Sequence, residues 1–382
     1  MMPLNACKSS DYFNMEGVLI VDISKKNWLG CDTPESLQED LKKCFLMMYR
    51  KEPNFKIRLL RYSENIIYKI AFPFSDPVVL RVHRTGYHTS EEIESELVWM
   101  RELTENTKVK VPYVFRGKDG KFLQHFTSSG GNVYTISLIS FLNGTMLRDL
   151  SGRSVYLTIR DIGKITARMH LESIEHLEHE NIGKSADNGE IYNKGIKHYK
   201  KLQRKAWDEK NFFDTGGVWG TWHDYCNISE RDKAILSGAE NKIKLELQKY
   251  GKTKENYGII HADLHALNII NDAGVNQVID FDDFGYGYYM YDLGCTLVTF
   301  SENLNIMAEE WLLGYESIRK LSSEDKEYAS MFILIRRLMR LAWLASHPDS
   351  DTARSVEPSY LKETVLMAER WSSNCGCRIL QS

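Results

Sequence analysis

Hydrophobic and polar positions change their spacing several times along the chain, and these changes predict its elements. Apolar side chains first recur at helical spacing from Leu37 to Met48. Thr33 followed by Pro34 is typical of a helix start, with Thr33 as the cap and Pro34 in the first turn. We therefore expect an amphipathic helix within an N-terminal extension, residues 1–54, that docks on the rest of the protein.

From Phe55 onward the spacing becomes that of strands. Short apolar runs begin at Ile57, Ile66 and Val78, and turn-prone residues separate them. A longer apolar run follows at residues 134–142. These runs predict a twisted antiparallel sheet.

A helix is expected between the third and the last of these strands. Residues 90–103 place Ile93 and Met100 on one apolar face. Further along, the Asp119-Gly120 pair predicts a hairpin turn. We assign the strands and the helix to one unit, residues 55–141.

Helical spacing dominates the remainder, residues 142–382. Ile159, Ile162 and Met169 line one face of a long helix that ends near His170, which we interpret as a packed or capping residue rather than a catalytic one. The fold class is therefore α+β, with a small antiparallel sheet followed by a larger helical part.

Composition adds few constraints. The chain has 382 residues, 43% of them hydrophobic, and a formal net charge of −3, so no strong field favours nucleic acid or an anionic membrane. Arg336, Arg337 and Arg340 break the longest apolar candidate, residues 332–345, before it reaches the length of a membrane span. Because the N-terminus also lacks a signal-peptide pattern, we expect a cytoplasmic protein with no nucleic-acid or membrane partner. The oligomeric state stays open.

The cysteines are scattered and odd in number, seven in all, which favours reduced thiols over a disulfide framework. Cys375 and Cys377 near the C-terminus are close enough to bind a metal or to oxidise, although a frayed tail with two exposed thiols is the simpler interpretation.

Candidate chemistry is concentrated after Ile260. Phosphoryl transfer needs one carboxylate to accept the proton of the attacking hydroxyl, and an amide oxygen and a second carboxylate to hold Mg²⁺. Asp263, Asn268 and Asp280 fit these three roles. Short apolar runs around residues 272–274 predict a hairpin between the last two, which would bring Asn268 and Asp280 side by side. Four signals are involved: the His261-x-Asp263 triplet, Asn268 five residues after the aspartate, the hairpin, and Asp280 after an apolar strand. Each alone is weak, and the four together favour phosphotransfer.

The block from Ile260 to Gly294 resembles the aminoglycoside phosphotransferase and choline kinase family, which shares the protein-kinase fold. Its DFDD motif at residues 280–283 is most similar to bacterial homoserine-kinase-type and stress-response kinase sequences. The resemblance implies a two-lobed protein-kinase-like fold, with a small antiparallel-sheet N-lobe and a larger helical C-lobe. Two departures are Ala262, where the family usually has Gly, and Ala266, where Pro is frequent. Ala preserves the loop unless position 262 needs a positive φ.

The resemblance also implies roles in the N-lobe. Arg81 would reach the nucleotide phosphates, and Glu96 would brace it from the following helix; an exposed strand arginine is the alternative for Arg81. The turn that contains Ser63 and Asn65 would cover the phosphates through backbone N–H groups, although it has no glycine. Backbone groups near the end of the last N-lobe strand would bind the adenine edge, unless this is only a core strand ending in a turn; the residues concerned are Ser140 and Leu142.

In the C-lobe the resemblance implies that His261 and Asp292 hold the catalytic loop in shape. Asp282 and Asp283 have three open interpretations: a second metal site, a partner for an amino group of the acceptor, or a solvated acidic loop. Aromatic residues between positions 175 and 256 would either shape the acceptor pocket or belong to the core; they are Trp207, Trp219, Trp222, His223 and Tyr225.

Together the residues and the resemblance predict a small-molecule kinase with Mg²⁺ as cofactor and ATP or GTP as donor. The γ-phosphoryl group would move to a hydroxyl of a small metabolite or an aminoglycoside-like antibiotic. Two alternatives are a Ser/Thr protein kinase of the bacterial stress-response type and a nucleotide-binding regulatory protein without turnover.

Overall fold

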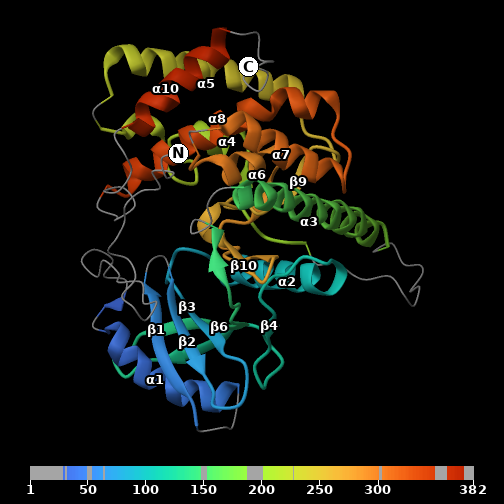
Figure 1. Ribbon diagram of the computed structural model, residues 1–382. Coiled ribbons are helices and arrows are strands. Elements are labelled where there is room, and N and C mark those ends of the chain that lie inside the picture. Colours follow the sequence, from blue (N-terminus) through green and yellow to red (C-terminus); the bar gives the residue numbers. More distant parts are fainter. Residues whose placement is uncertain are drawn as a thin grey trace.

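The computed structural model describes residues 29–30, 32–49, 54–62, 65–147, 153–186, 201–226, 228–300, 303–348 and 359–373. Ser63, Cys375 and Cys377 lie outside the described residues. Two lobes are evident in Figure 1, with a sheet below and most of the helices above. Within the described ranges, none of the helices combines the length and the apolar character that spanning a bilayer requires.

The N-lobe is built on an antiparallel sheet with the strand order β1-β2-β3-β6-β4, and β5 also pairs with β6. Its strands are β1 (Lys56–Tyr62), β2 (Ile66–Ala71), β3 (Val78–His83), β4 (Val114–Phe115), β5 (Gln124–Thr127) and β6 (Val133–Ser140). The predicted hairpin around Asp119-Gly120 is wrong as a strand pair, because β4 and β5 both pair with β6 and not with each other. The turn itself exists: Gly120 has a φ of 81° and Gly117 N–H donates to Lys121 O at 2.8 Å.

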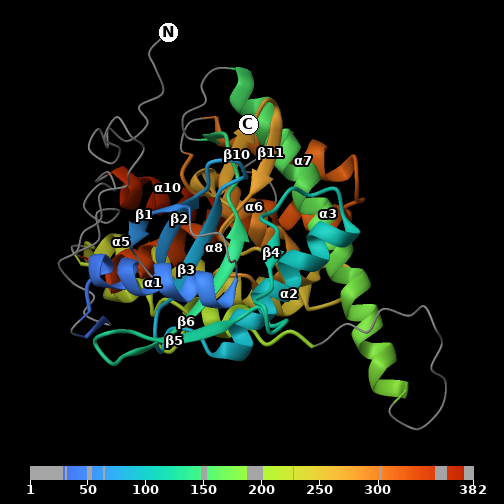
Figure 2. The same cartoon turned by 90° about the horizontal axis from the view of Figure 1, so that it is seen from below.

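Two helices accompany this sheet. Helix α1 (Pro34–Met48) begins where the sequence predicts, with the Thr33 side chain accepting from Ser36 N. It buries Leu37, Leu41 and Phe45 in one cluster with the sheet, and Figure 2 shows it lying across the strands. Helix α2 (Ser90–Asn106) is capped by Thr89 and continues three residues beyond its expected end.

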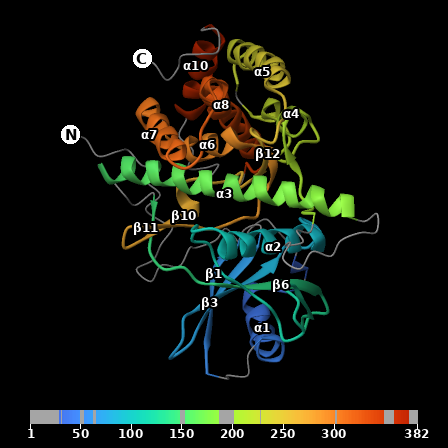
Figure 3. The ribbon, with the colours of Figure 1, turned by 90° about the vertical axis from the view of Figure 1, so that its right-hand side faces the viewer.

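The C-lobe is organised around α3 (Arg153–Ala186), which crosses the molecule between α2 and the helices α6 and α7 (Figure 3). Gly163 and Gly314 allow the close approach of α3 and α7, since a Cβ at either position would meet backbone of the other helix. The other helical elements are α4 (Glu209–Phe213), η3 (Trp222–Asp224), α5 (Glu230–Tyr250), η4 (Ala266–Asn268), α6 (Tyr289–Leu297), α7 (Leu304–Glu316), α8 (Ser323–Ser346) and α10 (Ser359–Ser373).

Two small sheets carry the loops of interest. One has the order β11-β10-β7, and the other has the order β8-β12-β9. Their strands are β7 (Thr145–Met146), β8 (Ala206–Trp207), β9 (Tyr257–Ile260), β10 (Ile269–Asp272), β11 (Val275–Val278) and β12 (Gly285–Tyr288). The hairpin predicted around residues 272–274 is confirmed, with Ile269 opposite Val278.

The tryptophans of the 175–256 region belong to the core. Trp207, Trp219 and Trp222 are 2%, 8% and 1% exposed. His223 is exposed, but its ring stacks on Trp222 and contacts Glu240. The core interpretation therefore holds for the three tryptophans.

Candidate active site

The loop between β9 and η4 is held by a buried carboxylate. Both oxygens of Asp292 accept backbone hydrogen bonds, from His261 N at 3.1 Å and from Ala262 N at 2.8 Å. His170 contacts Asp292 Oδ2 through Nε2 at 3.1 Å and Tyr315 Oη through Nδ1 at 2.9 Å. His170 is thus a packed residue that orients Asp292, and Asp292 in turn fixes the start of the loop.

Ala262 occupies a left-handed backbone position. Its φ is 65°, and the residue is fully buried. This is the conformation that glycine adopts without cost and that alanine adopts at roughly 1–2 kcal/mol. The loop therefore keeps the backbone shape that suits glycine, although the residue is alanine.

Asp263 and Asn268 are joined directly. Asn268 Nδ2 donates to the carbonyl oxygen of Asp263 at 2.9 Å and to its Oδ2 at 3.0 Å. Because the amide nitrogen is used in this way, Asn268 Oδ1 is the atom left to accept or to coordinate. The structure thus brings together two of the residues that the sequence assigned to phosphotransfer.

Asp280 lies next to Asn268 at the open end of the β10–β11 hairpin. Ile279 N–H donates to Asn268 O at 3.0 Å, and Asp280 follows with a φ of 64°. Its nearest cation is Arg61, with 3.8 Å between Nη1 and Oδ2. Burial and the neighbouring Asp282 raise the pKa of Asp280, against the opposing effect of Arg61.

This donor set fits a hard divalent cation such as Mg²⁺. An amide oxygen and a carboxylate, completed by substrate phosphates and water, are typical of magnesium sites in kinases. Among the described residues there is no group of three or more His, Cys, Asp or Glu side chains able to hold a metal alone. A site at Asn268 and Asp280 would therefore depend on the nucleotide for its remaining ligands.

Arg81 and Glu96 form a buried ion pair in the N-lobe. Arg81 Nη1 bonds to Glu96 Oε1, and the two side chains are 6% and 0% exposed. Arg81 lies on β3, and the whole residue is only 5% exposed. The alternative of an exposed strand arginine is therefore wrong. The pair has the arrangement in which a strand cation is braced by the following helix.

The adjacent carboxylates Asp282 and Asp283 have different surroundings. Asp282 Oδ1 accepts from Arg81 Nη2 at 3.2 Å and from Asn65 Nδ2 at 3.2 Å, so it is tied to the N-lobe. The Asp283 carboxylate makes no hydrogen bond or ion pair with any residue that the structure describes. Burial and the nearby Asp263 and Asp282 raise the pKa of Asp283 well above its ordinary value, against the opposing effect of Arg336. The solvated-loop interpretation is therefore wrong for Asp282, whereas Asp283 has the charge of Arg336 nearby but no direct ion pair among the described residues.

Two basic residues that the sequence did not single out contact Asp263. Arg336 Nη2, from α8, lies 2.6 Å from Asp263 Oδ1, and His265 Nε2 lies 3.2 Å from Oδ2. Burial opposes ionisation of Asp263, but His265 and Arg336 outweigh it and lower its pKa to about 2. The only sequence signal for Arg336 was its place in an otherwise apolar helix.

Two of the N-lobe residues predicted to contact the nucleotide, Asn65 and Ser140, already make hydrogen bonds within the protein. Asn65 Oδ1 accepts from Arg84 N at 3.2 Å, so Asn65 links its turn to both β3 and Asp282. Ser140 N–H donates to Tyr113 O at 2.8 Å, which leaves Leu142 rather than the Ser140 amide as the candidate for the adenine edge.

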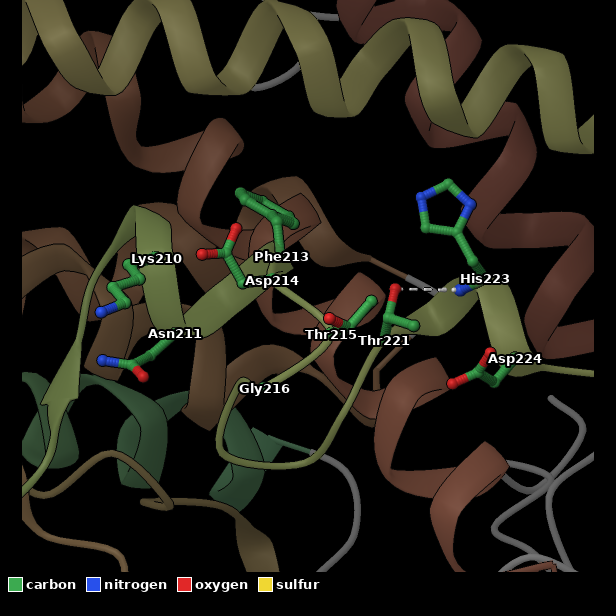
Figure 4. Close-up of a pocket in the computed structure, with 9 residues that line it drawn as sticks. All are labelled: Lys210, Asn211, Phe213, Asp214, Thr215, Gly216, Thr221, His223 and Asp224. Atoms are coloured by element: carbon green, nitrogen blue, oxygen red, sulfur yellow. Dashed lines mark hydrogen bonds between the residues drawn. The ribbon is translucent and has the colours of Figure 1, made fainter.

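A separate hollow of about 620 Å³ lies in the C-lobe beside α4 and η3. Figure 4 shows its lining, where Thr221 Oγ1 accepts from His223 N. None of the residues predicted for phosphate or metal binding lines this hollow. We therefore place the candidate active site at the interlobe residues described above.

Comparisons with known proteins identify related sequences and folds. A family model described as "Phosphotransferase enzyme family" matches residues 72–328. Amicoumacin kinase of Bacillus subtilis (strain 168) is 23% identical over 242 residues, which cover 63% of this chain and 62% of that protein. The chain thus spans less than two thirds of the length of this curated relative.

Solved structures show the fold. A microcompartment-associated aminopropanol kinase aligns with a TM-score of 0.72 and 29% identity, over 89% of this chain and 99% of that one. An amicoumacin kinase in complex with AMP-PNP, Ca²⁺ and Ami aligns with a TM-score of 0.62 and 18% identity, over 88% and 93% of the two chains. The α+β, two-lobed kinase-like fold expected from the sequence is confirmed.

Proposed function

Because the chain belongs to the phosphotransferase enzyme family, we propose that it is a small-molecule kinase that transfers the γ-phosphoryl group of ATP to a hydroxyl of an amine-bearing acceptor. One observation carries the proposal. Asp263, Asn268 and Asp280 lie together at the end of one hairpin, in a loop that Asp292 holds, and Asp282 connects them to the Arg81–Glu96 pair. These are the parts that phosphoryl transfer requires.

Each side chain has a defined task in this proposal. Arg81, braced by Glu96, would bind the nucleotide phosphates, and Leu142 would contact the base. Asn268 Oδ1 and the Asp280 carboxylate would hold Mg²⁺, which supplies charge neutralisation at the phosphates. In transfer, a bond forms between the acceptor oxygen and the γ-phosphorus, while the bond from that phosphorus to the β–γ bridging oxygen breaks and ADP leaves.

Asp263 would orient the acceptor hydroxyl. A carboxylate with a pKa of about 2 is a weak base, so its main contribution is to fix the direction of attack and to receive the proton late. A loose transition state makes this sufficient, because the hydroxyl loses its proton only as the new bond forms.

The amine preference rests on Asp283. Asp283 lies near the carboxylates of Asp263 and Asp282, and Arg336 offsets them only in part without bonding to Asp283, so an ammonium group of the acceptor would be favoured there over a neutral group. The related structure named as an aminopropanol kinase is consistent with an acceptor of this kind.

The test is a transfer assay on the full chain with Mg²⁺ and radiolabelled ATP or GTP. Amino alcohols such as 1-amino-2-propanol and ethanolamine are compared with matched diols that lack the amine. The proposal expects label on at least one amino alcohol and little on its diol. Labelling of a generic basic protein at a comparable rate, or equal use of amine and diol, would contradict it.

A further inference from the structure

A short stretch of the C-lobe, residues 202–207, lies against the acidic loop that follows the hairpin. We call residues 280–284 the metal loop. Within 202–207, strand β8 pairs in parallel with β12, the strand that follows the metal loop. The Tyr286 hydroxyl donates to Leu202 O at 3.1 Å, which fixes the other end of the stretch.

Side chains of this stretch bind four consecutive carbonyl groups of the metal loop. Arg204 Nε donates to Phe284 O at 2.8 Å, and Arg204 Nη2 donates to Phe281 O at 3.3 Å and also to Asp282 O. Trp207 Nε1 donates to Asp283 O at 2.8 Å. The Arg204 guanidinium also lies over the Phe284 ring, 4.5 Å from its centre.

This arrangement determines where the loop carboxylates point. A backbone with four consecutive carbonyls fixed has little freedom to rotate, and the side chains of Asp280, Asp282 and Asp283 leave from that same loop. Asp280 is already in a left-handed conformation, with a φ of 64°, so the loop relies on surrounding contacts to stay in this shape. Arg204 supplies three of the four carbonyl contacts.

The same stretch contacts the helix that carries Glu96. Gln203 N–H donates to Ser95 Oγ at 2.9 Å, and Ser95 precedes Glu96 in α2. Residues 202–207 thus join the brace of Arg81 to the metal loop. At Gly285 a Cβ would lie 2.4 Å from Lys205 O, so only glycine permits this close approach.

We propose that Arg204 is a positioning residue for divalent-metal binding, acting through the backbone of residues 280–284 rather than by touching metal or nucleotide. The inference rests on the proposed function, because it presumes metal-dependent nucleotide binding at Asn268 and Asp280. Contacts of this outer kind typically change metal affinity about 10–100-fold when removed.

The experiment measures ADP affinity by calorimetry with Mg²⁺ and with EDTA, for the full-length wild type, Arg204→Gln and Arg204→Lys. The readout is the gain in ADP affinity that Mg²⁺ produces. Lys205→Gln is the matched control, because it removes a charge from the same stretch while its exposed side chain makes no described contact with the loop.

In Arg204→Gln the Mg²⁺-dependent gain should fall at least about tenfold, while ADP affinity in EDTA stays near wild type. Arg204→Lys should recover part of the gain, since it keeps the charge but not the fork of donors, and Lys205→Gln should keep all of it. An unchanged gain in both Arg204 variants overturns the inference. Parallel loss of both affinities, or failure of both variants to fold, also overturns it, since Arg204 would then be a general structural residue. A wild type without any Mg²⁺ gain would instead count against the proposed function.

Discussion

Arg336 and Asp263 are 73 residues apart in the sequence, yet Arg336 Nη2 donates to Asp263 Oδ1 at 2.6 Å. The arginine is 6% exposed and lies over the Trp219 ring, 4.7 Å from its centre. The proposed acceptor-orienting carboxylate is thus held from the side of α8 as well as by Asn268. His265 and Arg336 together keep Asp263 ionised.

This pair should be energetically coupled. Arg336→Gln leaves the largely buried Asp263 carboxylate with His265 as its one remaining basic contact among the described residues and should destabilise the protein by up to about 3–5 kcal/mol. Asp263→Asn removes that charge, so the double variant should be less destabilised than the sum of the two singles, by about 0.5–3 kcal/mol. Urea unfolding of the four proteins measures this coupling.

The control is Arg340→Gln combined with Asp263→Asn. Arg340 is one turn further along α8, and its guanidinium lies over Tyr360. Arg340 makes no ion pair with Asp263 and interacts with it only through a longer-range electrostatic effect, so these two changes should come much closer to additive. Additive effects for Arg336 and Asp263 as well would show that the contact contributes nothing specific.

Ala262 predicts a second stability effect. Ala262→Gly removes a buried methyl group but relieves a left-handed alanine, whereas Ala266→Gly in the same loop region removes a buried methyl without such relief. The free energy of unfolding of Ala262→Gly should therefore exceed that of Ala266→Gly by about 1 kcal/mol. Thermal or urea unfolding of both variants checks this, and an equal loss in the two would mean that Ala262 is unstrained.

Asp280 predicts a pH dependence of metal binding. A divalent cation needs the ionised carboxylate, and the pKa of Asp280 is raised, so protonation begins at a higher pH than for an ordinary aspartate. The stabilisation that Mg²⁺ adds to the ADP complex should thus weaken as pH falls, before the ordinary aspartate range is reached. Melting temperatures with Mg²⁺ and with EDTA, measured across pH, give this difference.

The variant Arg61→Gln distinguishes the titration of Asp280 from the titration of the nucleotide phosphates. The phosphates titrate identically in the presence of the wild type and of the variant. Because Arg61 lowers the pKa of Asp280, its removal should move the loss of Mg²⁺ stabilisation to higher pH. Lys56→Gln on the same strand should not move it. A shift in the opposite direction, or an equal shift in both variants, would remove Asp280 from the metal site.

Substitutions of Asp282 and Asp283 should change the KM values of different substrates. Asp283→Asn should raise the KM for an amino alcohol about tenfold or more, in line with a charged hydrogen bond of about 1.5–3 kcal/mol, and leave the KM for ATP unchanged. Asp282→Asn should change the KM for ATP, because Asp282 contacts Arg81. Steady-state kinetics with each substrate varied distinguishes the two; the reverse pattern would exchange their assignments.

Local signals predicted much of the fold. The cap of α1, the start of α2, the first strands and the β10–β11 hairpin all depend on neighbouring residues, and the sequence predicts them correctly. The turn at Gly120 is also present, but the strands on either side of it, β4 and β5, both pair with β6 and not with each other. Local sequence did not indicate this pairing. Strand partners depend on the whole sheet.

In the candidate site, too, local sequence predicted some residues, whereas others depend on distant segments of the chain. Asp263, Asn268 and Asp280 occur in one continuous block, so spacing was enough to group them. Arg336 and Arg204 come from distant segments, and nothing near them in sequence indicates a ligand or a loop. The different surroundings of Asp282 and Asp283 likewise depend on which lobe each side chain meets.

The central claim is that Asp263 acts on the acceptor and not on the nucleotide. Asp263→Asn tests it most directly when Mg-ATP affinity and phosphoryl transfer to an amino alcohol are measured on the same preparation. We expect nucleotide affinity near wild type and a rate of transfer lower by about 10² to 10⁴, the usual contribution of a positioned acid–base group. Equal loss of affinity and transfer, or transfer that survives at the wild-type rate, would contradict it.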